Sequence, residues 1–410
     1  MIHILETVDQ RQVRRIMRDI RVDPYGIAIM APKAISHLLR INSLSNVAAN
    51  ILKQEMLALG GDAAIARGAL TGQSKKTDCL VMGNISQFNR LKEKLNRQPF
   101  GLDKLSRDLF CALDNYQKDS FVLKLGGYNL RLGARTHIMG IVNLTPDSFS
   151  GDGLYASHAA LLRGRPLTRA GTPHVIEFVE NIVSDGADII DVGGESSRPG
   201  AKPVSLKEEL SRVIPVIKIL AKKIKAPISI DTYKPQVARI ALDNGAVMVN
   251  DITGLRDIGM ARLVAKKKCA VVIMHMKGKP RTMQNNPVYA SLIEEIIRYL
   301  DNALQRAVNA GVGRDKIIID PGIGFGKTLQ HNLEILRKLK EFKVLGRPIL
   351  VGVSRKSFIG RILDAGPQDR IFGSISACLC AAENGASILR AHDVKEVKQA
   401  IEILDRVKNR

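Results

Sequence analysis

Eight short apolar segments alternate with longer amphipathic segments between residues 118 and 410, and this alternation constrains the fold more than any other feature. The amphipathic segment Leu292–Asn309 carries an apolar side chain at every fourth position, which is the spacing of one helix face. Strands that alternate with helices predict a parallel sheet, and eight such units predict an α/β fold, the (β/α)8 or TIM barrel. The predicted strands are Ile138–Val142, Ile189–Val192, Pro227–Ile230, Val247–Val249, Ala270–Met274, Ile317–Ile319, Ile349–Val351 and Ser387–Leu389.

A hairpin is predicted immediately before the first barrel strand. Apolar and polar residues alternate across Phe121–Leu132, on both sides of the pair Gly126-Gly127. We expect this hairpin to close the bottom of the barrel. The barrel domain with its hairpin is therefore expected to span residues 118–410.

Residues 1–117 are expected to form a smaller α/β domain, whose role the sequence does not indicate. Helical spacing occurs at Arg11–Ile20, Ser45–Leu59 and Ile85–Leu95. Short apolar runs predict strands, and these runs are Gly26–Met30, Ala63–Ala66 and Cys79–Met82.

Composition excludes several classes of function. The net charge of +22 could attract nucleic acid, but aromatic residues make up only 4% of the chain and do not interleave with the basic ones. We therefore expect no nucleic-acid partner. We also expect no membrane partner, because no apolar run approaches the roughly 20 residues of a membrane span. The start of the chain lacks a signal-peptide pattern, which predicts a cytoplasmic protein.

The five cysteines are scattered and lack the spacing of a metal site. We expect them to be small buried side chains.

Polar residues collect where the predicted strands end. In a (β/α)8 barrel, the carboxyl ends of the strands carry the active site. The predicted tips are Asn143 with Asp147, the loop 193–199, Asp231, Asn250 with Asp251, His275, Asp320, the segment 354–357, and Arg390 with His392.

These tips suit a flat heterocycle that carries hydrogen-bond donors. Asp231, Asn250 and Asp320 offer acceptors and an amide, and a carboxylate can accept two parallel N–H bonds. The planar guanidinium of Arg390 could stack on such a ring. Lys356 could serve as a donor near the reacting centre.

A second group of tips suits a diphosphate. Arg198, Arg390 and His392, together with Asn143, can bind its oxygens, and Asn143 can supply an oxygen ligand to Mg2+. The stretch 322–328 resembles a phosphate-binding P-loop, but Pro321 stands where the full motif needs Gly, so we interpret it as a substrate loop.

Eight motifs in order resemble the dihydropteroate synthase family over Phe121–Arg410. They read MGIVNLTPDSFS, DVGGESSRPGA, SIDTYKP, VNDITGL, VIMHMKGKPRTMQ, DPGIGFGKT, VGVSRKSFIG and LRAHDV. The resemblance implies a transferase of folate biosynthesis that joins p-aminobenzoate to 6-hydroxymethyl-7,8-dihydropterin diphosphate and releases diphosphate. It also implies Mg2+ as the metal, a homodimer, and sulfonamides as competitors of p-aminobenzoate.

The resemblance also implies roles for individual residues. The catalytic set is Lys356, Asp320, Asp231 and Asn143, with Asn143 as the metal ligand. The pterin site is Asp231, Asn250, Ile252, Met274, Asp320, Lys356 and Arg390. The diphosphate site is Asn143, Arg198, Arg390 and His392, and the p-aminobenzoate site is Ser197, Pro199, Phe325, Lys356 and Ser357. No tip pairs a nucleophile with a base, so we expect SN1-like substitution rather than a covalent enzyme intermediate.

The chain departs from the family pattern near two of these loops. Ser197 stands where the family usually has Thr, and Gly151-Asp152-Gly153 replaces the usual Asp-Gly-Gly. The same loop is lengthened by the segment Tyr155–Pro173. Residues 1–117 lie outside the basic pattern of the family.

Alternatives remain open at this stage. The chain could be a methyltetrahydrofolate:corrinoid methyltransferase, or a non-catalytic relative that binds pterin or nucleic acid. His275 either contacts substrate or orients a loop, and Asp147 and Asp251 either contact substrate or cap a turn. Glu195 is expected to be a structural partner of Arg198.

Overall fold

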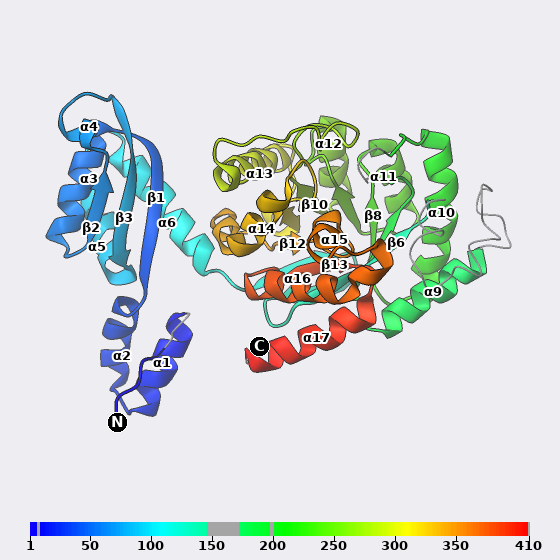
Figure 1. Ribbon diagram of the computed structural model, residues 1–410, viewed down its shortest axis with the longest axis horizontal. Coiled ribbons are helices and arrows are strands. Elements are labelled where there is room, and N and C mark those ends of the chain that lie inside the picture. The colour runs from blue at the N-terminus through cyan, green and yellow to red at the C-terminus, as the bar shows by residue number, and fades with distance from the viewer. Residues whose placement is uncertain (6–8, 146–171, 197–200, 409–410) are drawn as a thin grey trace. The chain divides into compact units, whose positions relative to one another are not determined.

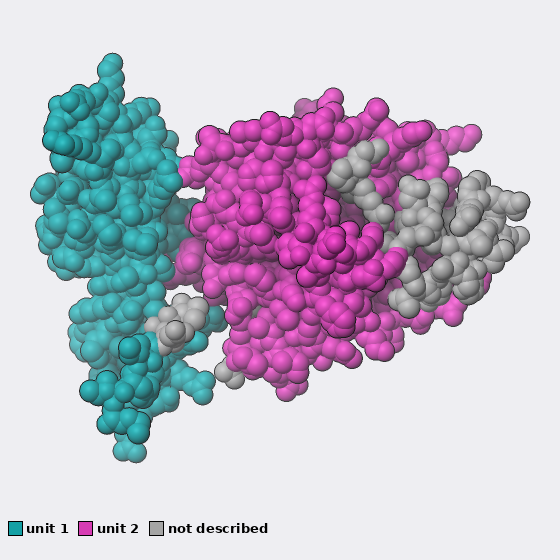
Figure 2. All heavy atoms as spheres, viewed as in Figure 1, with its two compact units in different colours: residues 1–113 teal, residues 114–410 magenta. Residues whose placement is uncertain are grey.

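The computed structural model describes residues 1–5, 9–145, 172–196 and 201–408. The chain forms two compact units, Met1–Leu113 and Asp114–Arg410 (Figure 2). The expected domain boundary at residue 117 coincides with the last residue of helix α6 (Leu102–Gln117).

Unit 1 contains a three-stranded antiparallel sheet covered by helices. The strands are β1 (Ser36–Ser45), β2 (Asp62–Ile65) and β3 (Lys76–Asn84), in the order β1-β3-β2. Leu52 and Met56 of α3 (Asn46–Ala58) and Phe88 of α5 (Ile85–Leu95) are fully buried in one apolar cluster with β3. Unit 1 also contains α1 (Gln10–Asp19), α4 (Arg67–Leu70) and the 3-10 turn η1 (Ala31–Lys33). The helices expected near residues 11–20, 45–59 and 85–95 are thus confirmed.

The strand expected at Gly26–Met30 is wrong, because this segment is helix α2 (Pro24–Met30). The Asp23 side chain caps the helix by accepting hydrogen bonds from the N–H groups of Tyr25 and Gly26, at 2.8 and 3.3 Å. Pro24 also favours a helix start, because its fixed φ suits the first turn. A short apolar run does not by itself distinguish strand from helix, and here the cap decides.

Unit 2 is the predicted eight-stranded parallel barrel with helices on its outside (Figure 1). The strand order is β11-β10-β9-β8-β7-β6-β13-β12, and a parallel bridge between Ile319 and Ile349 joins the two ends of this series. The strands are β6 (His137–Asn143), β7 (Ile189–Gly193), β8 (Ile228–Asp231), β9 (Met248–Asp251), β10 (Ala270–Met274), β11 (Ile317–Asp320), β12 (Leu350–Val351) and β13 (Ile388–Ala391).

The helices of unit 2 bury their apolar faces against the strands. In α13, the side chains of Leu292, Ile296, Leu300 and Leu304 are all buried, as the fourfold spacing predicts. The helices are α9 (Thr172–Ser184), α10 (Leu206–Lys223), α11 (Pro235–Asp243), α12 (Ile258–Lys267), α13 (Leu292–Asn309), α14 (Leu329–Arg337), α15 (Ser357–Leu363), α16 (Ile371–Glu383) and α17 (Val394–Val407). The 3-10 turns of this unit are η2 (Arg314–Lys316), η3 (Leu339–Leu345) and η4 (Pro367–Arg370).

The predicted hairpin closes the amino-terminal end of the barrel. It consists of β4 (Phe121–Leu125) and β5 (Tyr128–Leu132), which pair antiparallel around Gly126. Leu123, Leu125 and Leu132 are buried in one cluster with residues from the starts of the barrel strands, including Met248, Ala270 and Ile388. The bottom of the barrel is therefore packed, and the polar tips lie at its other end.

Three cysteines are buried as expected, whereas Cys111 and Cys380 are exposed. The expectation is wrong for these two, because each lies on the outward face of a helix. Across the described residues, no helix is long and apolar enough to cross a membrane.

Candidate active site

Arg390 lies at the centre of the charges at the carboxyl ends of the strands. Its Nε donates to Oδ2 of Asp191 at 2.6 Å, and its Nη2 donates to Oδ2 of Asp231 at 2.8 Å. Asn250 donates from Nδ2 to the same Asp191 oxygen at 3.0 Å. Burial lowers the pKa of Arg390, but the carboxylates of Asp191 and Asp231 raise it, and the result is a pKa above the usual value. The guanidinium is therefore fixed between β7, β8 and β13, which brings together three of the predicted pterin residues.

Asp191 is a site residue that sequence reasoning missed. It is completely buried, and its Oδ1 has no hydrogen-bond partner among the described residues. A buried acceptor without a partner is costly, so this atom marks a place where a ligand donor or water would be stabilised. A lone carboxylate inside the apolar run Ile189–Val192 was the available signal.

The pKa of the Asp231 carboxyl is raised toward neutral pH. Burial raises its pKa to about 7, Arg390 lowers it, and Asp191 adds a further raising effect. A ligand that donates N–H bonds would favour the ionised form of this carboxyl.

Asp320 and Lys356 lie on neighbouring tips. Oδ1 of Asp320 accepts the N–H of Gly322 at 2.6 Å, and burial raises the pKa of Asp320 while Lys356 lowers it. Burial lowers the pKa of Lys356 to about 8, and Asp320 raises it. The amine of Lys356 donates to the carbonyl of Ile323 and lies 4.6 Å from the ring centroid of Phe325. The structure thus places predicted pterin and p-aminobenzoate residues side by side.

A small apolar cluster lies next to these charges. Ile252 and Met274, both predicted pterin residues, are buried in it together with Met276 and Met283, and Phe325 packs against it. An apolar wall beside carboxylates and a lysine is the composition expected for a site that binds a flat, polar-edged ring.

Lys327 is a second residue that sequence reasoning missed. Its side chain is buried, with Nζ 2.9 Å from Nδ1 of His275 and 3.0 Å from the carbonyl of Phe325. Burial lowers the pKa of Lys327 well below its usual value, and burial with the nearby Lys327 lowers the pKa of His275 to about 2. A neutral His275 therefore accepts from the amine, which favours the loop-orienting alternative for His275.

Other carboxylates near the tips have structural partners. Nζ of Lys234 lies between Glu195 and Glu209, at 2.5 and 2.6 Å. Glu195 thus pairs with Lys234, whereas its expected partner Arg198 lies outside the described residues. Asp251 accepts the N–H groups of Thr253 and Leu255 at 2.8 and 3.0 Å, so here the turn-capping alternative describes the geometry.

The predicted diphosphate end is described in part. Nδ1 of His392 lies 3.1 Å from Oγ of Ser354, which fixes the imidazole beside the end of β12. Ser357, a predicted p-aminobenzoate residue, is exposed at the start of α15. The predicted residues Ser197, Arg198, Pro199 and Asp147 lie outside the described residues.

Asn143 ends β6 beside Gly193. A Cβ at Gly193 would lie 3.5 Å from Oδ1 of Asn143 and 3.7 Å from Oδ2 of Asp231. The absent side chain thus leaves hard oxygen atoms facing a common space. No three His, Cys, Asp or Glu side chains form a metal centre within the part of the chain that the structure describes. One amide oxygen supplemented by substrate oxygens and water fits Mg2+, which usually binds proteins in this way.

The barrel and the polar residues at its strand ends define the class of the protein as pterin-binding enzymes. The family model described as "Pterin binding enzyme" matches residues 139–392. Dihydropteroate synthase of Escherichia coli K12 is 43% identical over 269 residues, which cover 66% of this chain and 90% of that protein. The chain belongs to the dihydropteroate synthase family.

Solved structures agree with this assignment. A Yersinia pestis dihydropteroate synthase in a sulfonamide drug complex matches with a TM-score of 0.65 and 39% identity, covering 71% of this chain and all of that one. A Xanthomonas albilineans dihydropteroate synthase with 4-aminobenzoic acid matches with a TM-score of 0.63 and 39% identity, covering 70% and 98%. These relatives favour the synthase over the methyltransferase and the non-catalytic alternatives.

Unit 1 has a counterpart in a longer relative. A probable bifunctional folylpolyglutamate synthase/dihydropteroate synthase of Halobacterium salinarum is 36% identical over 394 residues. The match covers 96% of this chain but 45% of that protein, and it therefore extends through most of residues 1–113.

Proposed function

We infer that the chain is a dihydropteroate synthase, which joins p-aminobenzoate to 6-hydroxymethyl-7,8-dihydropterin diphosphate and forms 7,8-dihydropteroate and diphosphate. The observation that carries this inference is the Arg390 guanidinium fixed between Asp191 and Asp231, with Asp320 and Lys356 among the neighbouring charges.

We propose that the pterin binds among these charges. The carboxylates of Asp231 and Asp320 would accept N–H bonds from the ring edges, and Asn250 would add its amide. The planar Arg390 would lie against the ring, and Ile252 with Met274 would form the apolar wall.

We propose that p-aminobenzoate binds on the side of Phe325. The Phe325 ring offers an apolar face, and Lys356 beside it offers a cation. Ser357 at the start of α15, and Ser197 with Pro199, would complete this site. The Yersinia pestis relative is in a sulfonamide drug complex, which supports this chain as a sulfonamide target.

The reaction we propose is an SN1-like substitution. The bond between the pterin methylene and diphosphate breaks, and the carboxylate of Asp320 stabilises the positive charge that develops on the pterin. The p-aminobenzoate nitrogen then forms the new C–N bond, and its proton leaves to water or diphosphate. Arg198, Arg390 and His392 would stabilise the departing diphosphate.

Mg2+ is part of the proposal. Asn143 would hold it together with diphosphate oxygens, and the bound ion would supply charge neutralisation for the leaving group. The oxygen atoms of Asn143 and Asp231 that lie near the open position at Gly193 support this placement.

A coupled assay for diphosphate release tests the function, with Mg2+ and with or without p-aminobenzoate. Release should require p-aminobenzoate and should fall at least about 100-fold in kcat/KM in Lys356→Ala, a loss expected for removing a donor at developing charge. Lys338→Ala is the matched control, because Lys338 is an exposed lysine that pairs with Glu334 on the surface. Pterin binding by calorimetry without any turnover would contradict the synthase assignment.

We also propose a homodimer. Ile362 and Leu363 at the end of α15 and Phe372 at the start of α16 are exposed, Phe372 by 78%. Large apolar side chains gathered on a surface support a protein interface. We further propose a cytoplasmic location, which is supported by the buried thiols of Cys79, Cys269 and Cys378, none of which forms a disulfide, as in reducing compartments.

The dimer is tested by light scattering during size-exclusion chromatography. Phe372→Asp should convert dimer to monomer, because a charge buried in an apolar interface is costly. Ile258→Asp is the control, since Ile258 is also exposed but lies on α12. A monomeric wild type, or dissociation by both variants, would contradict this interface.

A further inference from the structure

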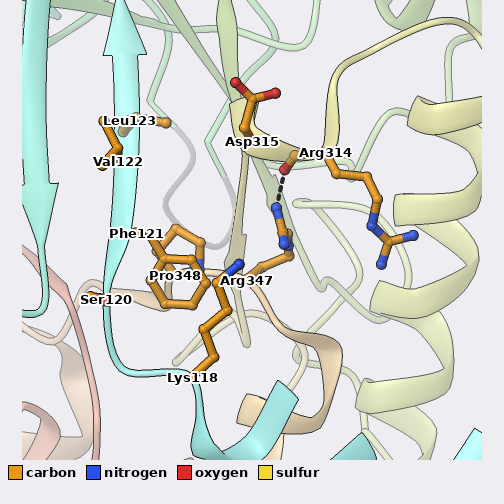
Figure 3. A pocket seen from close by; sticks show the side chains of 9 residues that line it. All are labelled: Lys118, Ser120, Phe121, Val122, Leu123, Arg314, Asp315, Arg347 and Pro348. Atoms are coloured by element: carbon orange, nitrogen blue, oxygen red, sulfur yellow. Dashed lines mark hydrogen bonds between the residues drawn. The ribbon is translucent and has the colours of Figure 1, made fainter. Parts of the chain in front are cut away.

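A cavity lies at the opposite end of the barrel from the candidate active site. Its volume is about 420 Å³, and it opens between β4, the turn η2 and the segment that leads into β12 (Figure 3). Arg314 and Asp315 precede β11, and Arg347 precedes β12, so the cavity faces the amino-terminal ends of these strands.

The cavity carries an excess of positive charge. Lys118, Arg314 and Arg347 line it, whereas Asp315 is the one carboxylate in its lining. Nζ of Lys118 lies 5.0 Å from the ring centroid of Phe121, and Cζ of Arg347 lies 5.9 Å from the same centroid. Two of the cations thus converge on one ring, as Figure 3 shows.

Arg347 is held there by a backbone carbonyl, and no carboxylate of the described residues forms an ion pair with it. Its Nη1 donates to the carbonyl of Arg314, and its buried Nε has no partner among the described residues. Burial and the charge of Arg314 lower the pKa of Arg347, and Asp315 opposes this effect. Because burial disfavours the charged form of Arg347, an anion beside its guanidinium would stabilise that form.

The walls of the cavity are tied together within unit 2. Nζ of Lys316 donates to the carbonyl of Lys124, which joins η2 to β4. Nδ2 of Asn115 donates to the carbonyl of Val344 at 2.8 Å, so the segment before β4 is joined to η3. Together with the bond from Arg347 to Arg314, these links make the cavity preformed, and a preformed site loses little free energy to ordering.

We propose that this cavity binds a phosphomonoester with an aromatic or apolar body, of about the size of a mononucleotide. A phosphomonoester carries about two negative charges near pH 7, which matches the excess of positive charge in the lining. The volume lies in the range of about 300 to 1,000 Å³ that is typical of small-molecule sites and exceeds what free phosphate needs. Val122, which is 53% exposed, and Pro348 supply an apolar wall for the body of the ligand.

Isothermal titration of the full chain with adenosine monophosphate tests the proposal. Separate titrations with inorganic phosphate and with adenosine should each give at least tenfold weaker binding, because each has only half of the recognised chemistry. Lys118→Gln and Arg347→Gln should each weaken nucleotide binding about tenfold, the usual loss for a hydrogen bond to a charged group. Lys118 is exposed, so its replacement leaves the core intact.

The control variant is Arg131→Gln, because Arg131 is an exposed cation on the same hairpin that does not line the cavity. Unchanged binding in this variant is expected. Equal weakening in Arg131→Gln, or binding of phosphate as tight as that of the nucleotide, would overturn the proposal. Displacement of the nucleotide by pterin diphosphate would also overturn the proposal, because it would place the ligand at the catalytic end of the barrel. The absence of saturable nucleotide binding would overturn it as well.

Discussion

At the scale of single residues, the site shows how neighbouring carboxylates set each other's ionisation. Asp191 contributes to the raised pKa of Asp231 and also holds Arg390 in place. We would call Asp191 a positioning residue, because it acts through Asp231 and Arg390. The pH dependence of activity can therefore distinguish its effect on Asp231 from a purely structural effect.

The pH dependence of kcat/KM for pterin diphosphate should report Asp231. Its pKa is raised to about 7, so the carboxyl gains a proton as the pH falls through 7 and can then no longer accept two N–H bonds. Below pH 7, kcat/KM should fall by up to about tenfold per pH unit. In Asp191→Asn this limb should move to lower pH, because a negative neighbour that raises the pKa is removed.

Steady-state kinetics between pH 5.5 and 8.5 would measure this limb of kcat/KM in wild type and in Asp191→Asn. The substrate's own titration is the same for both proteins, so it cannot move the limb between them. A limb at the same pH in wild type and Asp191→Asn would contradict the coupling.

Lys327 leads to a prediction about specificity. Lys327→Met keeps the approximate size of the side chain but removes the hydrogen bonds to Phe325 and His275. Because Phe325 is a proposed p-aminobenzoate contact, we expect KM for p-aminobenzoate to rise about tenfold, the usual cost of one such bond, with kcat nearly unchanged. Steady-state kinetics measure KM for p-aminobenzoate and kcat separately, with Lys338→Met, a change at an exposed residue, as control. A fall in kcat at constant KM would contradict the positioning role.

At the scale of elements, the loop after β11 depends on one glycine. Gly322 has φ +70, and a Cβ there would lie 1.9 Å from the carbonyl oxygen of His275. Gly322→Ala should therefore cost more than about 3 kcal/mol of unfolding free energy, since both strain and a backbone clash oppose it.

Gly311→Ala separates these two costs. Gly311 also has positive φ, at +95, but its Cβ would meet only Ala265 at an ordinary 3.7 Å. Its cost should stay near 1 kcal/mol, the value expected for φ alone. Urea unfolding would measure the difference, and equal losses in the two variants would show that the clash is relieved.

The elements of the barrel were predictable because local patterns determine them. Strand β10 has the predicted bounds Ala270–Met274, since five consecutive apolar residues are buried on both faces of a parallel sheet. Strand β1 was not predicted, because Leu38 and Leu39 are consecutive and a register shift between Ile41 and Leu44 interrupts the alternation of apolar and polar residues. Helix α2 was mistaken for a strand because its cap, Asp23, lies outside the apolar run.

The site was predictable in position but not in its pairings. Residues that end a strand, such as Asp231 and Asp320, were found from the boundary between apolar and polar sequence. Asp191 and Lys327 were missed because their importance depends on contacts across the barrel, with Arg390 and His275 respectively. Such non-local contacts leave no local pattern.

At the scale of the whole molecule, the described part of the candidate site belongs entirely to unit 2. The Escherichia coli relative covers 66% of this chain, close to the share that unit 2 represents. Unit 2 also has its own apolar core, which is separate from that of unit 1.

A chain of residues 114–410 should therefore fold and keep kcat within about threefold of the full chain, since a domain with its own core can fold alone. Circular dichroism and the diphosphate-release assay would measure this, with the full chain as reference. Loss of activity in a folded truncated chain would assign unit 1 a part in the reaction.

The pairing of β6 with β13 has a consequence for how the protein is made. β6 is the first barrel strand to leave the ribosome, but one of its two neighbours, β13, is translated after the seven other barrel strands, and His137 pairs with Ile388. Unit 1 can acquire its core while the rest is still being synthesised. The barrel cannot be closed until β13 has left the ribosome, and until then the flank of β6 stays open to partners other than β13.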